Sequence, residues 1–389
     1  MSRPQVYFDR TDCDLDAFKA LIAQPLPKDA VPRAAEVVAR VPVYDMDVCG
    51  ADLEDPEARR GLLAEWAWVL GEGPGVFVQR NAVPEPEVID GVTALYTRVI
   101  ADERAAGAGG ADHFAASGAN DRIWNSLQKL CLAEPALFVR YFGAPAIAAA
   151  AEAWLGPGFQ MTAQVNLVRP GGAAQEAHRD YHLGFQTEET ALSYPAHVHR
   201  LSPYLTLQGG IAHGPTPVES GPTQLLPWSQ QFGPGYLAYR DPAFRAVFDE
   251  AAVQIPLEKG DALFFNPALF HAAGANRSAD IQRLVNLMQV SSPFGRAMEA
   301  LDRAAMARAI YPHLQRMVAD GSLRPAQVAA AIACTAEGYP FPSNLDTDPP
   351  IGGLAPESQA ALMTRALSEG QTPEDFSVAL AAHGARRAP

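Results

Sequence analysis

Short apolar runs alternate with turn-forming residues between Phe159 and Pro293, and this pattern constrains the fold of the chain more than any other feature. The runs are rich in Val, Leu, Phe and Thr, which favour β-strands. Many short strands with Gly and Pro between them are typical of a β-sandwich or barrel, including the double-stranded jelly roll. We therefore predict a mainly β core over about residues 159–293. Its turns are expected at residues 170–172, 209–210, 219–222 and 259–261.

The sequence on either side of this core predicts helices, so the expected fold class is α+β around a mainly β core. Residues 1–40 mix charge with proline and form an N-terminal extension without a strong pattern. Residues 41–296 form the main domain, in which supporting helices precede the core. Residues 297–389 form a helical C-terminal extension, because the strand pattern stops after Phe294.

The individual elements follow from hydrophobic periodicity. Helices are predicted over residues 56–70, 84–104, 133–154, 297–319, 325–334 and 356–368, and short strands over residues 41–47 and 75–79. Pro145 and Pro312 are expected to interrupt the third and fourth of these helices. Glycine-rich residues 107–111 predict a flexible connection, and residues 340–350 a proline-rich loop.

Composition excludes several classes of function. The net charge is −14 and no cluster of five or six Lys and Arg residues occurs, which argues against nucleic-acid binding because such proteins neutralise phosphates with a basic surface. The four cysteines lie far apart, without a Cys-x-x-Cys pair, as expected in a reducing compartment. The first residues lack an apolar signal segment, and no run of 18 apolar residues occurs. We therefore expect a soluble, cytoplasmic protein without membrane contact.

The pair His178-x-Asp180 is the first candidate for chemistry. In a strand, residues i and i+2 point to the same face, so both side chains could reach one ion. Two histidines and one carboxylate, with open positions opposite, form a site that suits Fe(II) oxygen chemistry. A surface histidine beside a turn aspartate is the alternative, because nine histidines occur in the chain and His-x-Asp also arises by chance.

Two later residues add weight to that pair. His271 follows a turn and an apolar strand, in the run from Gly260 to His271. Arg283 opens an apolar strand over residues 283–290, and it needs an anionic partner if it faces inward. A bidentate arginine–carboxylate pair could hold a dicarboxylate co-substrate. A satisfied core histidine and an exposed edge-strand arginine are the alternatives. Arg277 lies among turn formers and is expected at the surface.

These residues resemble the phytanoyl-CoA dioxygenase family of 2-oxoglutarate oxygenases in both order and spacing. The resemblance covers roughly residues 76–293, and its motifs are His178-x-Asp180, the runs 219–227 and 260–271, Asn276 and Arg283. It implies a double-stranded β-helix, that is, a cupin-like jelly roll. It also implies Fe(II) held by His178, Asp180 and His271, and 2-oxoglutarate held by Arg283.

The resemblance also implies a reaction. The expected activity is a dioxygenase that consumes O2 and 2-oxoglutarate, hydroxylates a small-molecule metabolite and releases succinate and CO2. Asp180 favours hydroxylation over halogenation, because related halogenases have a small residue at that position. The net negative charge of the chain disfavours a polyanionic substrate such as a CoA ester.

The chain departs from the family pattern at Ala273, where a serine often assists the co-substrate carboxylate. Candidates for that second contact to 2-oxoglutarate come from neighbouring predicted strands: Gln164, Asn166 and Gln208.

Other polar residues are candidates for substrate contact. His182 would continue the strand face of the His-x-Asp pair, with a solvated histidine as the alternative. Arg122 and Asn125 precede an apolar helix and offer polar groups to a substrate, with a helix cap as the alternative. His213, beside Gly214, is expected in a loop.

Two rival functions remain. The first is a non-catalytic jelly-roll protein that binds a ligand or partner. The second is a cupin-type metal enzyme that uses the spacing His197-x-His199, although no glutamate follows at the distance that a cupin needs. The C-terminal helices are interpreted as a packing or homo-oligomerisation element, with a lid over the site as the alternative.

Overall fold

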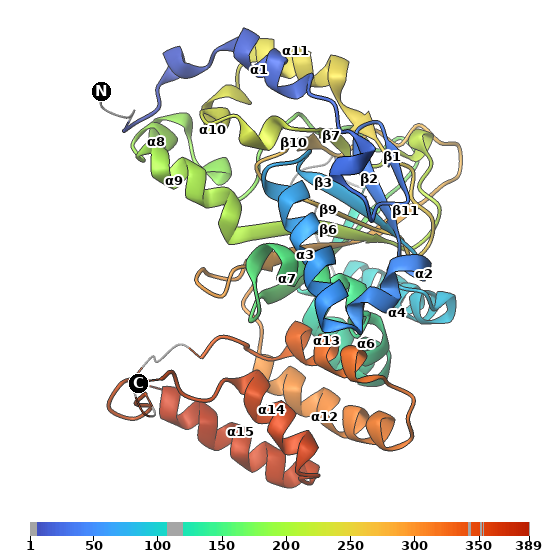
Figure 1. The fold of residues 1–389 in the computed structure, drawn as a ribbon. Helices are drawn as coiled ribbons and strands as arrows, with labels where there is room; N and C mark the ends of the chain where they lie inside the picture. The colour runs from blue at the N-terminus through green and yellow to red at the C-terminus, as the bar shows by residue number, and fades with distance from the viewer. Residues whose placement is uncertain (1–5, 107–119, 341–343, 351, 353, 389) are drawn as a thin grey trace.

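The computed structural model describes residues 6–106, 120–340, 344–350, 352 and 354–388. In the view of Figure 1, a large sheet occupies the middle of the molecule, a layer of helices lies below it, and a small sheet with short helices lies above it. The fold is therefore α+β with a jelly-roll core, as predicted. Among the described residues, no helix is long and apolar enough to cross a membrane.

The large sheet joins segments that are far apart in the sequence. Within the described residues its order is β1-β2-β3-β9-β6-β11-β5-β4. All neighbours pair antiparallel except β2 and β3, which are parallel. Its strands are β1 (Glu36–Val38), β2 (Val41–Asp45), β3 (Val76–Arg80), β4 (Asn120–Ile123), β5 (Gln160–Val168), β6 (Thr206–Ala212), β9 (Ala262–Phe265) and β11 (Arg283–Ser291).

The small sheet packs against one face of the large sheet. Its order is β10-β7-β8, and all pairs are antiparallel. Its strands are β7 (Gln224–Leu226), β8 (Val253–Gln254) and β10 (Phe270–Ala272). Leu225 of the small sheet lies in the same apolar cluster as Val78 and Phe265 of the large sheet. Two facing sheets of this kind form the walls of a jelly roll.

The two faces of the large sheet have different neighbours. Along β11, Leu284 and Val290 pack into the main core beneath the sheet. Val285 and Gln289 alternate with them and line a cavity on the side of the small sheet. The period of two along a strand thus divides β11 between a helix-covered face and a cavity face.

The helices before the core cover the lower face. Those predicted over 56–70 and 84–104 are present, and the one predicted over 133–154 is divided at Pro135 as well as near Pro145, because the residue before a proline avoids helical geometry. They are α2 (Met46–Cys49), α3 (Pro56–Gly71), α4 (Pro86–Ala105), α5 (Ser126–Ala133), α6 (Pro135–Phe142) and α7 (Pro145–Leu155). The predicted connection over residues 107–111 lies outside the described residues.

The C-terminal helices are α12 (Arg303–Ala319), α13 (Pro325–Thr335), α14 (Gln359–Ser368) and α15 (Pro373–Arg387). The predicted break at Pro312 is wrong, because α12 runs through it. Pro312 is exposed, so the carbonyl that loses its partner can bind water, and the buried residues Ile310 and Leu314 hold both halves of the helix. The sequence did not predict α15. Of the predicted loop 340–350, residues 341–343 lie outside the described residues.

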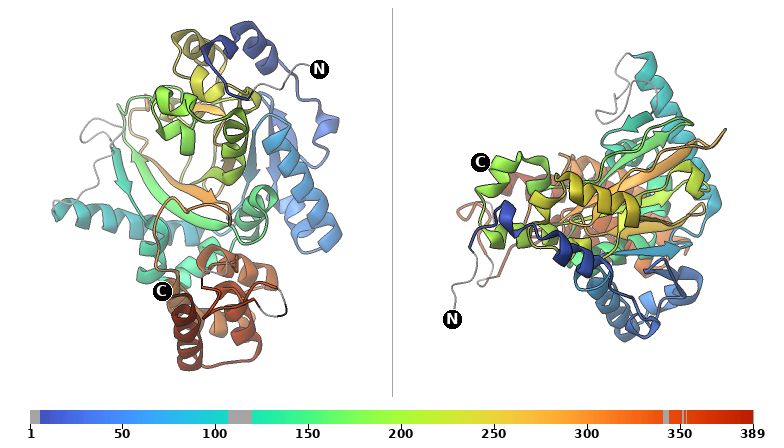
Figure 2. Two further views of the ribbon diagram at one scale, coloured as in Figure 1. Left: turned by 90° about the vertical axis from the view of Figure 1, so that its left-hand side faces the viewer. Right: turned by 90° about the horizontal axis from the view of Figure 1, so that it is seen from above.

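The C-terminal helices share the main core with the helices before the jelly roll. Met306 of α12 and Ala331 of α13 belong to the same cluster as Phe138 of α6 and Ile147 of α7. Figure 1 shows α13 below α7 and beside α6, with α12 lower down, and the left view of Figure 2 also shows the C-terminal helices, in orange to red, at the lower end of the molecule. The division at residue 296 stays a prediction, since the packing is continuous across it.

Several short helices interrupt the predicted strand region or precede it. The sequence did not predict them. Three span only four to six residues, too few for a clear periodicity, whereas the two of eight and ten residues each have a buried apolar face that was not recognised. They are α1 (Leu15–Ile22), α8 (Glu188–Leu192), α9 (Ala196–Leu201), α10 (Gly235–Ala238) and α11 (Pro242–Ala251).

Candidate metal centre

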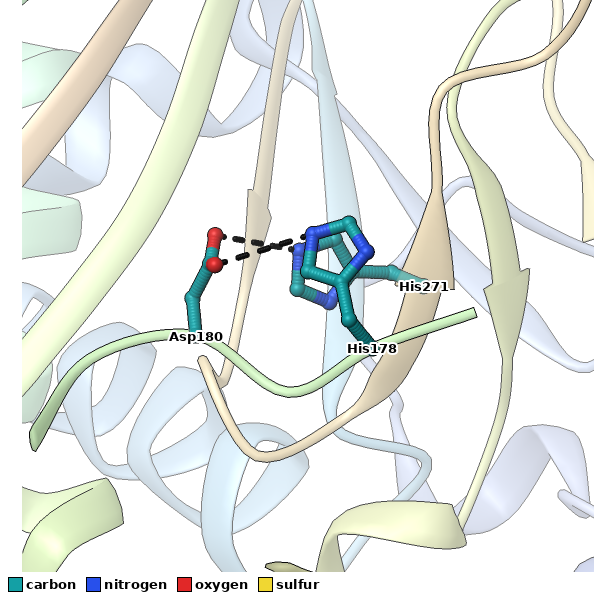
Figure 3. A group of neighbouring side chains, drawn as sticks. All are labelled: His178, Asp180 and His271. Atoms are coloured by element: carbon teal, nitrogen blue, oxygen red, sulfur yellow. Dashed lines mark ion pairs between the residues drawn. The ribbon is translucent and has the colours of Figure 1, made fainter. Parts of the chain in front are cut away.

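His178 and Asp180 lie on the connection between β5 and β6, alongside β10. His178 N–H donates to the carbonyl oxygen of His271 over 3.0 Å, and His271 N–H donates back over 3.2 Å. Asp180 N–H donates to the carbonyl oxygen of Pro267. The segment is extended but forms only an isolated bridge, so the expected regular strand is absent. The i, i+2 alternation still turns both side chains toward His271, as Figure 3 shows.

The three side chains form a compact cluster. Nε2 of His178 lies 3.6 Å from Oδ1 of Asp180, and Nε2 of His271 lies 3.4 Å from Oδ2. One ligand atom of each residue lies within 4.8 Å of the others. Two imidazole nitrogens and one carboxylate oxygen at this spacing can hold one metal ion, and this donor set suits Fe(II) with positions left open.

A backbone carbonyl orients each imidazole. Nδ1 of His178 lies 2.8 Å from the carbonyl oxygen of Glu176, and Nδ1 of His271 lies 2.8 Å from that of Leu269. A carbonyl can only accept, so Nδ1 carries the proton in both rings. Each Nε2 therefore keeps its lone pair free for a metal, which is the usual way in which a second contact prepares a histidine ligand.

The electrostatics of the cluster favour the protonation states that a metal needs. Burial alone would raise the pKa of Asp180, but the neighbouring side chains of His271, His178 and Gln208 together hold it well below its usual range. Gln208 Nε2 donates to Asp180 Oδ2 over 2.5 Å. Burial lowers the pKa of His178, and His271 lowers it further. The cluster thus presents a carboxylate and a neutral imidazole, ready to bind a cation.

A cavity of about 660 Å³ lies beside the cluster, between the two sheets. The three cluster residues form part of its wall. Five of the polar residues expected at the site line it as well: Arg122, Gln164, Asn166, Gln208 and Arg283.

Arg283 faces into this cavity, as expected, and is only 6% exposed. Its Nη1 donates to the carbonyl oxygen of Ser220 over 3.3 Å, and no carboxylate among the described residues pairs with it. Burial lowers the pKa of Arg283 to about 10. A buried cation without an anion is unfavourable, so a ligand carboxylate would stabilise it. Arg277, by contrast, is exposed, as expected.

The motif residues around Arg283 shape its surroundings. Gly221 has φ of 74°, and a Cβ at this position would collide with the carbonyl oxygens of Gly274 and Ala275, so only glycine fits. Asn276 Nδ2 donates to the carbonyl oxygens of Val168 and Ile281, over 3.1 and 2.8 Å. The glycine and the asparagine therefore fix the turns that lead into β11.

The three candidates for a second co-substrate contact differ in their partners. Gln208 is bonded to Asp180, as described above. Gln164 accepts from Arg122 and donates to Gln289, both over 3.0 Å. Asn166 pairs with Val285 of β11, close to Arg283 along the strand, and within the described residues its Oδ1 has no hydrogen-bond partner.

Two expected substrate residues do not line the cavity. At Tyr181 and His182 the backbone has positive φ and enters the short 3-10 helix His182–Phe185, so the expected continuation of the strand face is wrong. The His182 side chain is exposed and its Nδ1 lies 3.1 Å from Ser202 Oγ. Asn125 has φ of 53° and occupies the N-cap position of α5, where its backbone N–H donates to Glu299.

Three further histidines lie outside the metal cluster. His213 lies in the bend that follows β6, as expected of a loop residue, but it is 5% exposed and bonded to Thr93 and Tyr141. His197 and His199 lie on α9, where residues two apart point in different directions, so they cannot share a metal ion as a cupin pair does. His199 Nε2 is bonded to the carbonyl oxygen of Ala191, and His197 is exposed.

Several residues of the cavity wall were not predicted from the sequence. Gln289 could have been found, because it shares the strand face of Arg283 by the period of two. Others lie on turns and connections, which have no periodicity to follow; among them are Trp124, Phe185, Thr223 and Met298.

A jelly roll with a His–Asp–His cluster beside a cavity between its sheets defines the class of iron- and 2-oxoglutarate-dependent oxygenases. The chain belongs to the phytanoyl-CoA dioxygenase family, whose model matches residues 72–284, more than half of its length. No curated protein sequence matches it.

Several solved structures resemble the chain. One is the non-heme alpha-ketoglutarate-dependent epimerase SnoN from nogalamycin biosynthesis, with 21% identity and a TM-score of 0.38, over 61% of this chain and 84% of that one. SnoN in complex with Fe3+, alpha-ketoglutarate and nogalamycin RO matches with 20% identity and a TM-score of 0.39, over 61% and 85%. AviO1 from Streptomyces viridochromogenes Tue57 matches with 19% identity and a TM-score of 0.40, over 56% and 90%.

The residues present fit the cofactors of this family. The cluster supplies two Nε2 lone pairs and one carboxylate, and the cavity beside it contains a buried arginine with no anionic partner among the described residues. Family membership and this donor set together support Fe(II), 2-oxoglutarate and O2 as cofactor and co-substrates.

Proposed function

We propose that this protein is a dioxygenase that hydroxylates a small molecule, with His178, Asp180 and His271 as its iron ligands. The observation that carries the proposal is the cluster itself, in which three ligand atoms converge while both Nδ1 atoms are bonded elsewhere. When bound, iron supplies the activation of O2, coupled to conversion of 2-oxoglutarate to succinate and CO2 and to insertion of one oxygen atom into a substrate C–H bond.

Arg283 is the residue that we assign to 2-oxoglutarate. It is buried, it lines the same cavity as the three ligands, and the only hydrogen bond of its guanidinium among the described residues goes to the Ser220 carbonyl. Its guanidinium can hold the distal carboxylate of the co-substrate by two parallel hydrogen bonds. Asn166 and the Thr223 hydroxyl lie on the same cavity wall and can supply the contact that Ala273 lacks.

Asp180 supports hydroxylation as the outcome. Its carboxylate occupies the ligand position that would have to be vacated for a halide. Gln208 donates to Oδ2 and so fixes the orientation of the carboxylate. His271 is 4% exposed, and Phe265 packs against its ring with 4.7 Å between centroids, so water has restricted access on that side.

The cavity favours a substrate of metabolite size with both polar and apolar parts. A volume of about 660 Å³ has to hold the co-substrate and the substrate together. The side chains Trp124, Phe185 and Met298 offer apolar contacts, and Gln164 and Gln289 offer amides.

The proposal is tested by iron binding and by turnover of 2-oxoglutarate. Purified protein should bind one Fe(II) under anaerobic conditions and form succinate from 2-oxoglutarate and O2, and a metabolite library screened by succinate formation should reveal the substrate. His178→Ala and His271→Ala should each abolish iron binding and turnover. The matched control is His197→Ala, because His197 is exposed on α9 and the cupin hypothesis would require it.

Each alternative gives a different result. Full iron content and turnover in both ligand variants would refute the assignment of the ligands. A wild-type protein that binds ligands but never forms succinate would indicate a non-catalytic jelly-roll protein instead.

A further inference from the structure

Arg179, between the two ligands His178 and Asp180, is a buried cation on the opposite side of their segment. It is 2% exposed, and no acidic residue in the described part of the chain forms an ion pair with it. Because neighbouring residues of an extended segment point to opposite faces, its side chain leaves the metal cluster and enters the protein behind it.

Carbonyl oxygens and aromatic rings surround the guanidinium. Nη2 donates to the carbonyl oxygens of Ser229, over 2.6 Å, and Phe232, over 3.1 Å. The guanidinium carbon lies 5.1 Å from the ring centre of Tyr236 and 5.2 Å from that of Phe270. Burial lowers the pKa of Arg179 to about 10. Carbonyl groups and ring faces both stabilise a cation, so the charge is compensated without an acid.

The carbonyl groups and rings around the guanidinium, here called the Arg179 cage, also contact β10, the strand that carries the third ligand, His271. Phe270 directly precedes His271, and on β10 their side chains point to opposite faces. Ser229 joins the two segments: its carbonyl accepts from Arg179, and its hydroxyl oxygen accepts from Phe270 N–H over 2.8 Å. The residues on the reverse side of all three ligands are therefore bound to one another.

The backbone around the cage depends on this packing. Tyr181, which directly follows Asp180, has φ of 62° and ψ of 157°. Residues other than glycine rarely adopt this backbone conformation. Such strain persists only where the surrounding contacts fix the chain. Gly235 leaves room for the guanidinium, since a Cβ there would collide with three of its atoms.

We propose that Arg179 is a positioning residue, which holds the His178–Asp180 segment against β10 so that the three ligands converge. The proposal rests on the proposed metal site but concerns only how its residues are held. Arginine is specifically required, because a planar guanidinium can lie between two rings while donating to carbonyls, whereas an ammonium cannot do both.

The test uses Co(II), a spectroscopic substitute for Fe(II), titrated anaerobically into the metal-free full-length protein. Arg179→Met should raise the dissociation constant of Co(II) by about 10–100-fold, the range typical of lost supporting contacts, in protein that circular dichroism shows to be folded. Arg179→Lys should restore at most part of the affinity.

The matched control is Arg303→Met. Arg303 is another largely enclosed arginine that donates to two carbonyl oxygens, those of Thr335 and Met161, but it lies among the C-terminal helices. Its loss should lower the unfolding temperature and leave the Co(II) dissociation constant unchanged. An unchanged Co(II) affinity in Arg179→Met would overturn the proposal and make Arg179 a contributor to stability alone.

A further variant keeps the test decisive if Arg179→Met does not fold. Gly235→Ala keeps the charge and displaces the guanidinium, so it should weaken Co(II) binding in the same direction, and unchanged affinity would again overturn the proposal. Failure of the wild-type protein to bind Co(II), or retention of binding in His271→Ala, would instead refute the metal site itself.

Discussion

Arg283 and Asn286 lie three residues apart on β11 and face opposite sides of the large sheet, and both are buried. Asn286, on the helix-covered face, accepts from Ser126 and donates to Tyr141, each over 3.3 Å. Arg283, on the cavity face, has a single carbonyl partner among the described residues. The side chain of Asn286 is thus satisfied by the protein, whereas the guanidinium of Arg283 is left for a ligand. Incomplete hydrogen bonding therefore distinguishes Arg283 from Asn286 on the same strand.

The hydrogen bonds that connect Asn286 to His213 on the helix-covered face run in one consistent order from donor to acceptor. Asn286 donates to Tyr141, the Tyr141 hydroxyl lies 2.7 Å from His213 Nε2, and His213 Nδ1 lies 2.8 Å from Thr93 Oγ1. Thr93 in turn donates its only hydroxyl proton to the carbonyl oxygen of Ile89. Every donor has an acceptor only if His213 is neutral with the proton on Nδ1. A complete chain of this kind stabilises a fold but has no group left for chemistry.

The largest effect is expected from deletion of the C-terminal helices, which belong to the core on the helix-covered side of the large sheet. Deletion of residues 297–389 should abolish cooperative unfolding, because it exposes core residues such as Phe138 and Ile147, which pack with α12 and α13. Deletion from residue 356 onward should be milder and retain a cooperative transition at lower temperature, although it removes Phe376 from its stack on Tyr311. Differential scanning calorimetry measures both. An unchanged transition in the longer deletion would show that these helices are not part of the core.

The second prediction concerns the cavity face alone. Arg283→Ala should raise the 2-oxoglutarate concentration needed for half-maximal succinate formation by about two to three orders of magnitude, since loss of one partner of a buried ion pair costs roughly 3–5 kcal/mol. The unfolding temperature of the ligand-free protein should not fall, because the substitution removes a buried guanidinium that has no anionic partner among the described residues. Arg277→Ala is the control, and its exposed guanidinium predicts little change. The reverse ranking of the two variants would exclude Arg283 as the co-substrate arginine.

The third prediction sharpens the contrast within one strand. Asn286→Ala should destabilise the protein by about 2–4 kcal/mol, because Ser126 and Tyr141 each lose a buried partner. Gln289→Ala, on the cavity face of the same strand, should cost less than about 1 kcal/mol, since Gln289 is partly exposed and adjoins the cavity. Urea denaturation of both variants provides the comparison. Equal losses would mean that the two faces do not differ in the way proposed.

The sequence predicted the cavity face better than the helix-covered face. The three ligands His178, Asp180 and His271 follow from the family resemblance, whereas the shared face of His178 and Asp180 and the inward side of Arg283 follow from the period of two, which is local. The burial of His213 was not predicted, because its partners Thr93 and Tyr141 are 120 and 72 residues away, and no local pattern reports such contacts. The cage of Arg179 was missed for the same reason, since Ser229 is 50 residues distant. The isolated bridge at His178 and the turn at Tyr181 depend on tertiary contacts that override strand periodicity.

The last prediction uses pH to test the direction of the His213 network. Burial lowers the pKa of His213 to about 3. The charged groups that act on it, Asp90 and Lys259, form an ion pair with each other. A depressed folded-state pKa means that the stabilisation is complete above the unfolded value near 6.5 and is lost as the pH falls from there toward 3.

Between pH 7 and pH 5 the proton taken up by the unfolded state alone should cost about 2 kcal/mol of stability. His213→Gln keeps one donor and one acceptor but does not titrate. The variant should therefore lose about 2 kcal/mol less stability than the wild type between pH 7 and pH 5. The other histidines contribute equally in both proteins. The measurement is the free energy of unfolding by urea at both pH values, for the wild type and the variant. Identical pH slopes would show that His213 takes up its proton in the folded protein, and the network could then not have the direction inferred from its hydrogen bonds.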